Sequence, residues 1–430
     1  MKRLLLLLLF TVLLIPAYSQ DTVRVMAYNI LDWPLPSAGA KAPYLKTVVN
    51  YYHPDILICT EVTSDAVAVD ILNNVLNLGG NTYAKAAYTD GPDKDNMIFF
   101  NLAKLHLKSQ DTIQTALRLI NRYRLYHNTV TVDTVYLDCY AAHLKASDGS
   151  VNATDRYWEC KHWKNYIETK TQGKNIIFGG DFNLYNSTEP AYKLITDSGS
   201  YKVYDPINMP GSWNSNAAFS IIHTQSTHLS TGGGFIGGGL DSRFDFLMVS
   251  HDIMVNGNHV QYAPGSFLAL GNDGLHYNMG LTNTPLSATV PDSVTNALYN
   301  MSDHLPVVMK VITTAVVNAL PEPTNYPTNY SARNIHLQWT GAAGPVFPDG
   351  YLVRMSSVGF AAIQTPVDGT PVANSATDKN IPGSSVETWF GGLNPLTTYY
   401  FKIFGYSGTG SVINYKVDGT IPQVSITTTP

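Results

Sequence analysis

Short apolar runs alternate with amphipathic stretches along most of the chain. Runs typical of buried strands cover residues 23–29, 56–60, 97–100, 105–107, 129–132, 135–142 and 176–179. Apolar residues at helical spacing cover residues 44–52, 66–76 and 155–169. The runs between residues 97 and 142 follow one another directly, as in a meander, whereas helices separate the others. This mixture predicts an α/β domain in which two packed β-sheets are covered by helices.

The pattern changes after Val311. The segment "VVNALPEPTNYPTNYS" is rich in Pro, Asn and Thr, as linkers are. Only strand-like runs follow it, which predicts an all-β domain. We therefore expect a signal peptide at residues 1–19, an α/β domain at 20–314, a linker at 315–326 and the all-β domain at 327–430.

The first residues have the form of a secretory signal peptide. A basic start at Met1 to Arg3 precedes an apolar run from Leu4 to Ile15 and a small-residue cleavage site that ends at Ser19. We expect cleavage near Ser19 and a soluble, secreted protein, located in the bacterial periplasm or outside the cell. A retained membrane anchor is the alternative, which the shortness of the run and Pro16 disfavour. No integral membrane segment is expected in the mature chain.

Charge and cysteine content narrow the picture further. The formal net charge of −5 means that no overall positive field marks the chain as a nucleic-acid binder, although a local basic groove can exist on an acidic protein. Cys59, Cys139 and Cys160 are an odd number of thiols without metal-ligand spacing. We expect buried, inert thiols rather than a disulfide framework.

Polar residues stand at or just beyond the ends of several apolar runs. In chain order they are Asn29, Glu61, His143, Asp181, Asn183, Asp245, Asp303 and His304. Any one of them alone is more often a turn former or a satisfied polar group. Together, each following or preceding a strand in one order, they indicate a catalytic site, because strand ends are where rigid scaffolds present chemistry.

This order of residues resembles the endonuclease/exonuclease/phosphatase superfamily, which includes pancreatic-type deoxyribonucleases, abasic-site endonucleases, bacterial sphingomyelinases and inositol-polyphosphate phosphatases. The resemblance spans Val23 to Val311, and "GGDFN" and "SDH" are its most specific pieces. It implies a four-layer α/β sandwich and hydrolysis of phosphoesters. Abasic-site endonucleases carry an acidic residue two positions after the Asn, whereas this chain has Leu31 there and Asp32 one place later. The abasic-site function therefore loses support.

The C-terminal domain resembles a fibronectin type III module. Trp339 stands in an early strand, and an L-x-P-x-T-x-Tyr pattern runs from Leu393 to Tyr399. In that family the tryptophan packs in the core and the tyrosine forms a corner, so both are expected to be structural. The full expectation is an α/β sandwich of two mixed β-sheets flanked by helices, followed by an all-β sandwich.

Phosphoester hydrolysis needs cations and positioned donors at the phosphoryl group. We assign Glu61 and Asp303 as ligands of Mg²⁺ or Mn²⁺, because carboxylate oxygens suit these cations. The resemblance implies that Asn29 lies in the same ligand shell or bonds to phosphate. If the segment after "NIIFGG" stays extended, Asp181 and Asn183 project to one face. Asp181 would then orient the attacking water, and Asn183 would donate to a phosphoryl oxygen.

Two histidines complete the expected site. The resemblance implies that Asp245 bonds to the His304 imidazole, which fixes its tautomer and favours its charged form. Such a pair can accept a proton from water or stabilise phosphate charge, and the sequence does not choose between these roles. His143 is expected to be the acid at the leaving oxygen or a phosphate contact. Gly179 and Gly180 are expected to leave room for the substrate backbone.

The leading hypothesis is a secreted, divalent-metal-dependent phosphodiesterase, an extracellular nuclease in which a metal-activated water attacks phosphorus. The first alternative is a sphingomyelinase-like phospholipid phosphodiesterase, which would need an exposed apolar loop that the sequence does not reveal. The second is a catalytically inactive adhesion or binding protein of the same fold. The expected partners are a phosphodiester substrate, most simply nucleic acid, and a surface protein or glycan at the C-terminal module. We expect a monomer.

Overall fold

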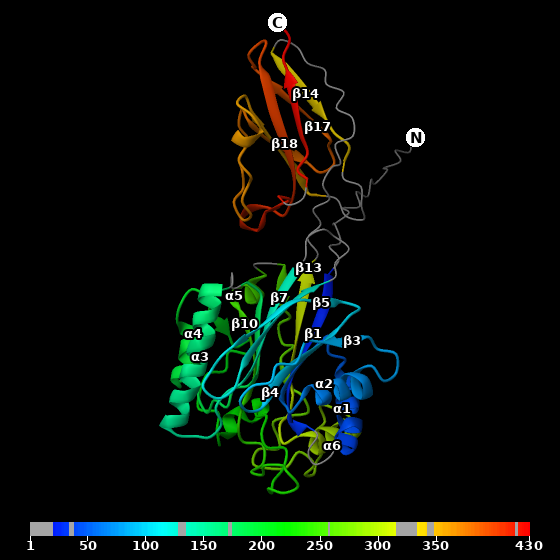
Figure 1. The fold of residues 1–430 in the computed structure, drawn as a ribbon, viewed down its shortest axis with the longest axis vertical. Coiled ribbons are helices and arrows are strands. Elements are labelled where there is room, and N and C mark those ends of the chain that lie inside the picture. The colour runs from blue at the N-terminus through cyan, green and yellow to red at the C-terminus, as the bar shows by residue number, and fades with distance from the viewer. Residues whose placement is uncertain are drawn as a thin grey trace, which may run out of the picture.

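The computed structural model describes residues 20–33, 38–127, 135–170, 174–256, 259–314, 333–341, 348–417 and 420–430. The predicted signal peptide, the predicted strand at 129–132 and the predicted linker lie outside these residues. Within residues 20–314, two β-sheets lie between two groups of helices (Figure 1).

The first sheet has the order β11-β13-β1-β2-β4-β3, and β12 also pairs with β13. Its strands β1 and β2 are parallel, and its other pairs are antiparallel. The bounds are β1 (Gln20–Trp33), β2 (Ile56–Val62), β3 (Tyr83–Lys85), β4 (Asp95–Asn101), β11 (Val260–Tyr262), β12 (Leu268–Ala269) and β13 (Val307–Thr314). Its outer face packs on α1 (Ala38–Tyr52), α2 (Asp65–Ile71), a following π-helical turn (Leu72–Leu76) and α6 (Asp292–Met301).

The second sheet has the order β5-β6-β7-β8-β10-β9. Here β7 and β8 are the parallel pair. The bounds are β5 (Leu105–Ile113), β6 (Ile120–His127), β7 (Val135–His143), β8 (Ile176–Asp181), β9 (Val203–Tyr204) and β10 (Asp245–Ser250). Helices α3 (Ser150–Lys170) and α4 (Pro190–Asp197) cover its outer face, the short helix α5 (His251–Val255) follows β10, and a 3₁₀ turn spans Ala217–Ile222.

The hydrophobic core has three parts that match the layers. Apolar side chains of both sheets, including Ile58 of β2 and Ile177 of β8, meet in the middle. Each sheet also packs its outer face on its own helices, as Leu57 does in the first sheet and Phe178 in the second. Alternate residues of one strand thus face different cores, as the period of two requires. The predicted four-layer α/β sandwich is confirmed.

Strand β6 is the one element of the meander that the apolar pattern did not predict. Its sequence "INRYRLYH" carries two arginines, and Arg122 lies buried with its Nε 2.9 Å from the Asp138 carboxylate of β7. The charge that conceals the strand in the sequence is neutralised across the sheet. The helix predicted from residue 155 begins earlier, at Ser150.

The described C-terminal residues form two β-sheets that share one core. The first pairs β14 (Asn334–Gln338) with β17 (Glu387–Gly391); the second contains β15 (Gly350–Ser356), β16 (Asp378–Pro382), β18 (Thr398–Ser407), β19 (Asn414–Tyr415) and β20 (Gln423–Thr427). Trp339 and Tyr399 lie in the shared core, and the Asn394 N–H donates to the Tyr399 hydroxyl at 2.9 Å. These contacts are compatible with the expected all-β module; its fibronectin type III identity stays a prediction.

Two smaller expectations concern thiols and membranes. Cys59, Cys139 and Cys160 are free and buried, and burial raises the pKa of each thiol, so the prediction of buried, inert cysteines is confirmed. In the part of the chain that the structure describes, no helix is long and apolar enough to cross a membrane.

Candidate active site

Strand register brings three of the predicted residues side by side in the second sheet. His143 ends β7 and pairs with Asp181, which ends the parallel strand β8. Asp181 in turn pairs with Asp245, which begins the antiparallel strand β10. The ends of two parallel strands and the start of their antiparallel neighbour lie at the same sheet edge, so the three side chains meet there.

The first sheet contributes the other residues at the same edge. Asn29 of β1 pairs with Thr60 of β2, directly before Glu61. Residues 302–304 lead into β13, which runs antiparallel to β1 with Val307 opposite Ala27. The Ser302 hydroxyl donates to the Asn29 carbonyl at 2.7 Å and accepts from the His304 N–H at 3.1 Å, which fixes this segment against β1.

Uncommon backbone conformations aim two of these side chains. Glu61 has a φ of 64° at an irregularity in the pairing of β2 with β4, and Asn183 has a φ of 50°. Such conformations cost on the order of 1 kcal/mol or more and cluster at functional sites. Gly180 has a φ of 137°, and a Cβ there would lie 2.0 Å from the Ala142 carbonyl oxygen. The expectation that Gly180 makes room for substrate is therefore wrong: it makes room for strand β7.

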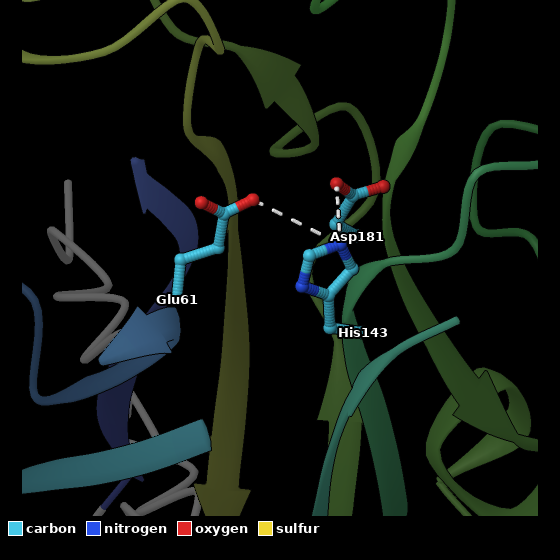
Figure 2. A group of neighbouring side chains, drawn as sticks. All are labelled: Glu61, His143 and Asp181. Atoms are coloured by element: carbon cyan, nitrogen blue, oxygen red, sulfur yellow. Dashed lines mark ion pairs between the residues drawn. The ribbon is translucent and has the colours of Figure 1, made fainter. Parts of the chain in front are cut away.

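Four side chains form a compact cluster of metal-ligand types. Asn29 Nδ2 donates to Glu61 Oε1 and to Asp181 Oδ2, both at 3.0 Å. His143 Nε2 lies 3.5 Å from Asp181 Oδ2 and 3.9 Å from Glu61 Oε1, and Figure 2 shows both acidic side chains directed toward its ring. Glu61, His143 and Asp181 can offer ligand atoms to one ion. The oxygen-rich donor set fits a hard divalent cation such as Mg²⁺ or Mn²⁺.

The charges in this cluster oppose one another. Burial alone would raise the pKa of Glu61, but His143, Lys94 and the Asn29 hydrogen bond bring it down to about 2. Burial lowers the pKa of His143 to about 4, more than the nearby carboxylates raise it. Glu61 is therefore ionised and the His143 ring neutral at neutral pH. A neutral imidazole can donate a hydrogen bond to phosphate but carries no spare proton, which favours the phosphate-contact role for His143.

His304 and Asp245 form a second, adjacent unit. His304 Nδ1 lies 2.7 Å from Asp245 Oδ2, and its Nε2 lies 3.7 Å from Asp181 Oδ2. Burial would lower the pKa of His304, but the charges of Asp245 and Asp181 raise it well above the usual value. Burial also raises the pKa of Asp181. These charges favour the protonated ring, which suits stabilisation of phosphate charge better than acceptance of a proton.

Asp303 and Asn183 have neighbours that the sequence did not suggest. Asp303 Oδ2 accepts from the Ile236 N–H at 3.0 Å, and the residue is absent from the clusters of possible metal ligands among the described residues. Asn183 is not extended as expected; its N–H donates to Asp181 Oδ1 at 3.0 Å, and its Nδ2 donates to the Leu144 carbonyl at 3.1 Å. Asn183 therefore braces Asp181 in this structure.

Sequence reasoning missed Lys94 and Gln225. Lys94 Nζ lies 3.0 Å from Glu61 Oε2 and 2.7 Å from Asp32 Oδ2. Its only signal is its place directly before β4, whose first residue pairs with the residue after Glu61. Gln225 Nε2 lies 2.8 Å from His304 Nε2, and no motif marks it. Both contacts depend on strand pairing or loop paths, which a single sequence does not show.

No protein-family model and no curated protein matches the chain. Among solved structures, D. rerio TDP2 complexed with single strand DNA product is 11% identical, with 68% of this chain and 99% of that chain covered at a TM-score of 0.46. The human Nocturnin catalytic domain with bound sulfate anion is 18% identical, with 68% and 97% covered at 0.44. An endonuclease/exonuclease/phosphatase family protein from Bacteroides thetaiotaomicron is 15% identical, with 69% and 97% covered at 0.43.

These likenesses say nothing of the chemistry, and the activity proposed below rests on the residues of the site.

Proposed function

We propose that this protein is a metal-dependent phosphodiesterase of the endonuclease/exonuclease/phosphatase superfamily. The observation that carries the proposal is the convergence of Glu61, Asp181 and His143 beside the His304–Asp245 pair, at the edge where both sheets end. The ionised Glu61 carboxylate near a protonated imidazole can hold a cation and an anionic group at adjacent positions. Phosphate esters are substrates of this kind, because their hydrolysis needs both a cation and positive charge beside the phosphoryl oxygens.

The residues fit Mg²⁺ or Mn²⁺. Glu61 is ionised. Its Oε1 and Asp181 Oδ2 both accept a hydrogen bond from Asn29 Nδ2, so the two oxygens lie close together. Asp303 offers Oδ1, a buried oxygen that has no hydrogen-bond partner among the described residues. We propose Glu61 as the principal ligand, with Asp303 beside it, while Asn29 holds the Glu61 carboxylate in place through its Nδ2. A divalent cation, when bound, supplies positive charge next to the phosphoryl oxygens.

The remaining side chains have distinct proposed roles. Asp181 orients a water molecule for attack on phosphorus and takes its proton, because its raised pKa makes it a better base than a solvated aspartate. His304, held by Asp245, places positive charge on a phosphoryl oxygen. His143 donates a hydrogen bond to the phosphate. Asn183 holds the Asp181 carboxylate in place through the hydrogen bond from its backbone N–H.

The substrate we favour is extracellular nucleic acid, consistent with the leader-like first residues. Sphingomyelin is the second candidate, and one observation favours it. Leu229 and Ile236 are 55% and 54% exposed, and the Ile236 N–H bonds to Asp303. Exposed apolar residues beside a catalytic loop are what a membrane-acting enzyme needs, and the sequence alone did not reveal this loop.

A substrate panel tests the proposal. The purified protein is assayed with Mn²⁺ against single-stranded DNA, RNA, sphingomyelin vesicles and a chromogenic phosphodiester. We expect hydrolysis of the chromogenic ester and of one or both nucleic acids. Cleavage of sphingomyelin alone would replace the nuclease proposal with the second candidate. Cleavage of none, by protein with native-like circular dichroism, would contradict the activity.

A further inference from the structure

A cavity of about 450 Å³ lies between helix α3, the loop after β5 and the segment that follows β7. Ala116, Leu117, Lys145, Trp158 and Glu159 are among its lining residues. Helix α3 contributes four side chains at positions i, i+3, i+4 and i+7, so one face of the helix forms the wall. They are Asp155, Trp158, Glu159 and His162. The volume is within the range of small-ligand sites.

This cavity shares a rigid wall with the candidate active site. The wall is the segment 144–147, which directly follows His143. The Leu144 carbonyl accepts from Asn183 Nδ2 at 3.1 Å and from an Arg118 guanidinium nitrogen at 2.9 Å. The Lys145 N–H donates to Glu159 Oε2 at 2.8 Å, and Arg156 donates to the Lys145 and Ser147 carbonyls at 2.9 Å. Asn183 also donates to Asp181 through its backbone N–H, so it links this segment to Asp181 and fixes the position of one relative to the other.

Trp158 gives the cavity a flat apolar surface. Its side chain is 55% exposed although it belongs to the well-packed helix α3, and its ring meets that of Tyr157 edge-on at 5.3 Å. Leu117 and Ala116 line the cavity together with this indole. An exposed indole in an apolar recess favours a planar aromatic ligand, because stacking buries both faces without demanding a particular hydrogen-bond pattern.

Lys145 supplies a cation that is not committed to a carboxylate. Among the described residues its Nζ bonds to the Ala146 carbonyl at 3.0 Å, and no ion pair to a carboxylate is found for it. By contrast, Lys94 is paired with Asp32 and Glu61, and Arg118 Nε with Asp93. In a chain with a net charge of −5, an uncommitted ammonium two residues from His143 is suited to a phosphate group.

We propose that the cavity is a nucleobase subsite for single-stranded nucleic acid. One base stacks on Trp158 and the adjoining phosphate contacts Lys145, while a neighbouring phosphodiester lies at the hydrolytic cluster. The proposal rests on the proposed phosphodiesterase function and names its substrate class. Aromatic side chains and a nearby cation are the elements that bind unpaired bases with little sequence preference.

Binding without hydrolysis tests the subsite. The full chain in excess chelator is titrated calorimetrically with a deoxyadenosine hexamer and with a hexamer of the same backbone that lacks all bases. We expect the dissociation constant of the base-containing hexamer to be about tenfold lower, as one stacked base allows. In Trp158→Ala this ratio should fall close to one, and in Trp158→Phe it should largely return. Lys145→Gln should weaken both hexamers and leave the ratio unchanged.

Trp389→Ala is the matched control, because Trp389 is 56% exposed and lies in the C-terminal sheets. It should leave both affinities at the wild-type value. Equal affinity of the wild type for both hexamers, no binding of either, or an unchanged ratio in Trp158→Ala would overturn the subsite. Binding with the expected ratio but no hydrolysis after Mn²⁺ is added would contradict the proposed function and leave the subsite standing.

Discussion

Replacing Asp245 with Asn tests the role of the charged His304 ring. The substitution keeps an oxygen near His304 Nδ1 but removes the charge that now lies 2.7 Å away, in a site where both residues are almost fully buried. A hydrogen bond between charged groups contributes about 1.5–3 kcal/mol. If this energy holds the imidazolium in place in the transition state, kcat should fall by a factor on the order of 10 to 10².

The pH profile of kcat gives the sharper readout. Asp245 and Asp181 raise the pKa of His304 well above 6.5, so the wild type should stay active as pH rises past that value. As pH rises, the activity of the Asn variant should begin to fall at a lower pH than that of the wild type, because the pKa of its imidazole is lower. The same sign applies to folding: the stabilisation from protonated His304 is complete below pH 6.5 and is lost as pH rises through the folded-state pKa.

The assay is hydrolysis of a small phosphodiester between pH 5 and 9. Asp138→Asn is the control, since Asp138 is also buried and ion-paired, with Arg122, but lies toward the opposite end of β7 from His143. It should lower stability without moving the profile. An Asp245→Asn protein with wild-type kcat and an unmoved alkaline limb would refute the reasoning.

Three further predictions follow from the same structure. Asp181→Asn should lower kcat by a factor on the order of 10² or more while thermal unfolding shows a melting temperature no lower than wild type, because burial already disfavours the charged form. Burial raises the pKa of Glu159 from 4.5 to about 7, so Glu159→Gln should match wild-type stability near pH 4 and exceed it by roughly 3 kcal/mol at pH 8.5 in urea unfolding; equal stability at both pH values would contradict this. A protein ending at Thr314 should fold and retain hydrolysis of a small phosphodiester, since all clustered residues precede it; a folded but inactive product would show that the C-terminal domain contributes to the site.

The sequence predicts the scaffold and the membership of the site better than the contacts within it. His143, Asp181 and Glu61 follow apolar runs that become buried strands, so their position at strand ends is visible in the pattern alone. The four-layer arrangement follows from runs that alternate with helical stretches. Strand β6 was missed because Arg122 is neutralised by a residue of another strand, which periodicity does not register.

The finer geometry depends on backbone conformations that have no sequence signal. Asn183 was expected to share a face with Asp181, but its positive φ turns its amide to the Leu144 carbonyl. Lys94 reaches Glu61 only because β4 is antiparallel to β2. His304 is almost fully buried. The site is not open to water around this ring, so His304→Ala would leave the buried Asp245 without its partner and cost stability as well as activity.

Metal dependence of hydrolysis tests the central claim most directly. Activity on a chromogenic phosphodiester is measured in excess chelator, after Mg²⁺ or Mn²⁺ is returned, and again in Glu61→Gln, with Glu168→Gln as a control on the outer helix α3. The account predicts no activity in chelator, recovery with either cation in wild type and control, and no recovery in Glu61→Gln, because the ionised oxygen of Glu61 is the principal ligand proposed. Full wild-type activity in excess chelator, or full activity in Glu61→Gln, would contradict it.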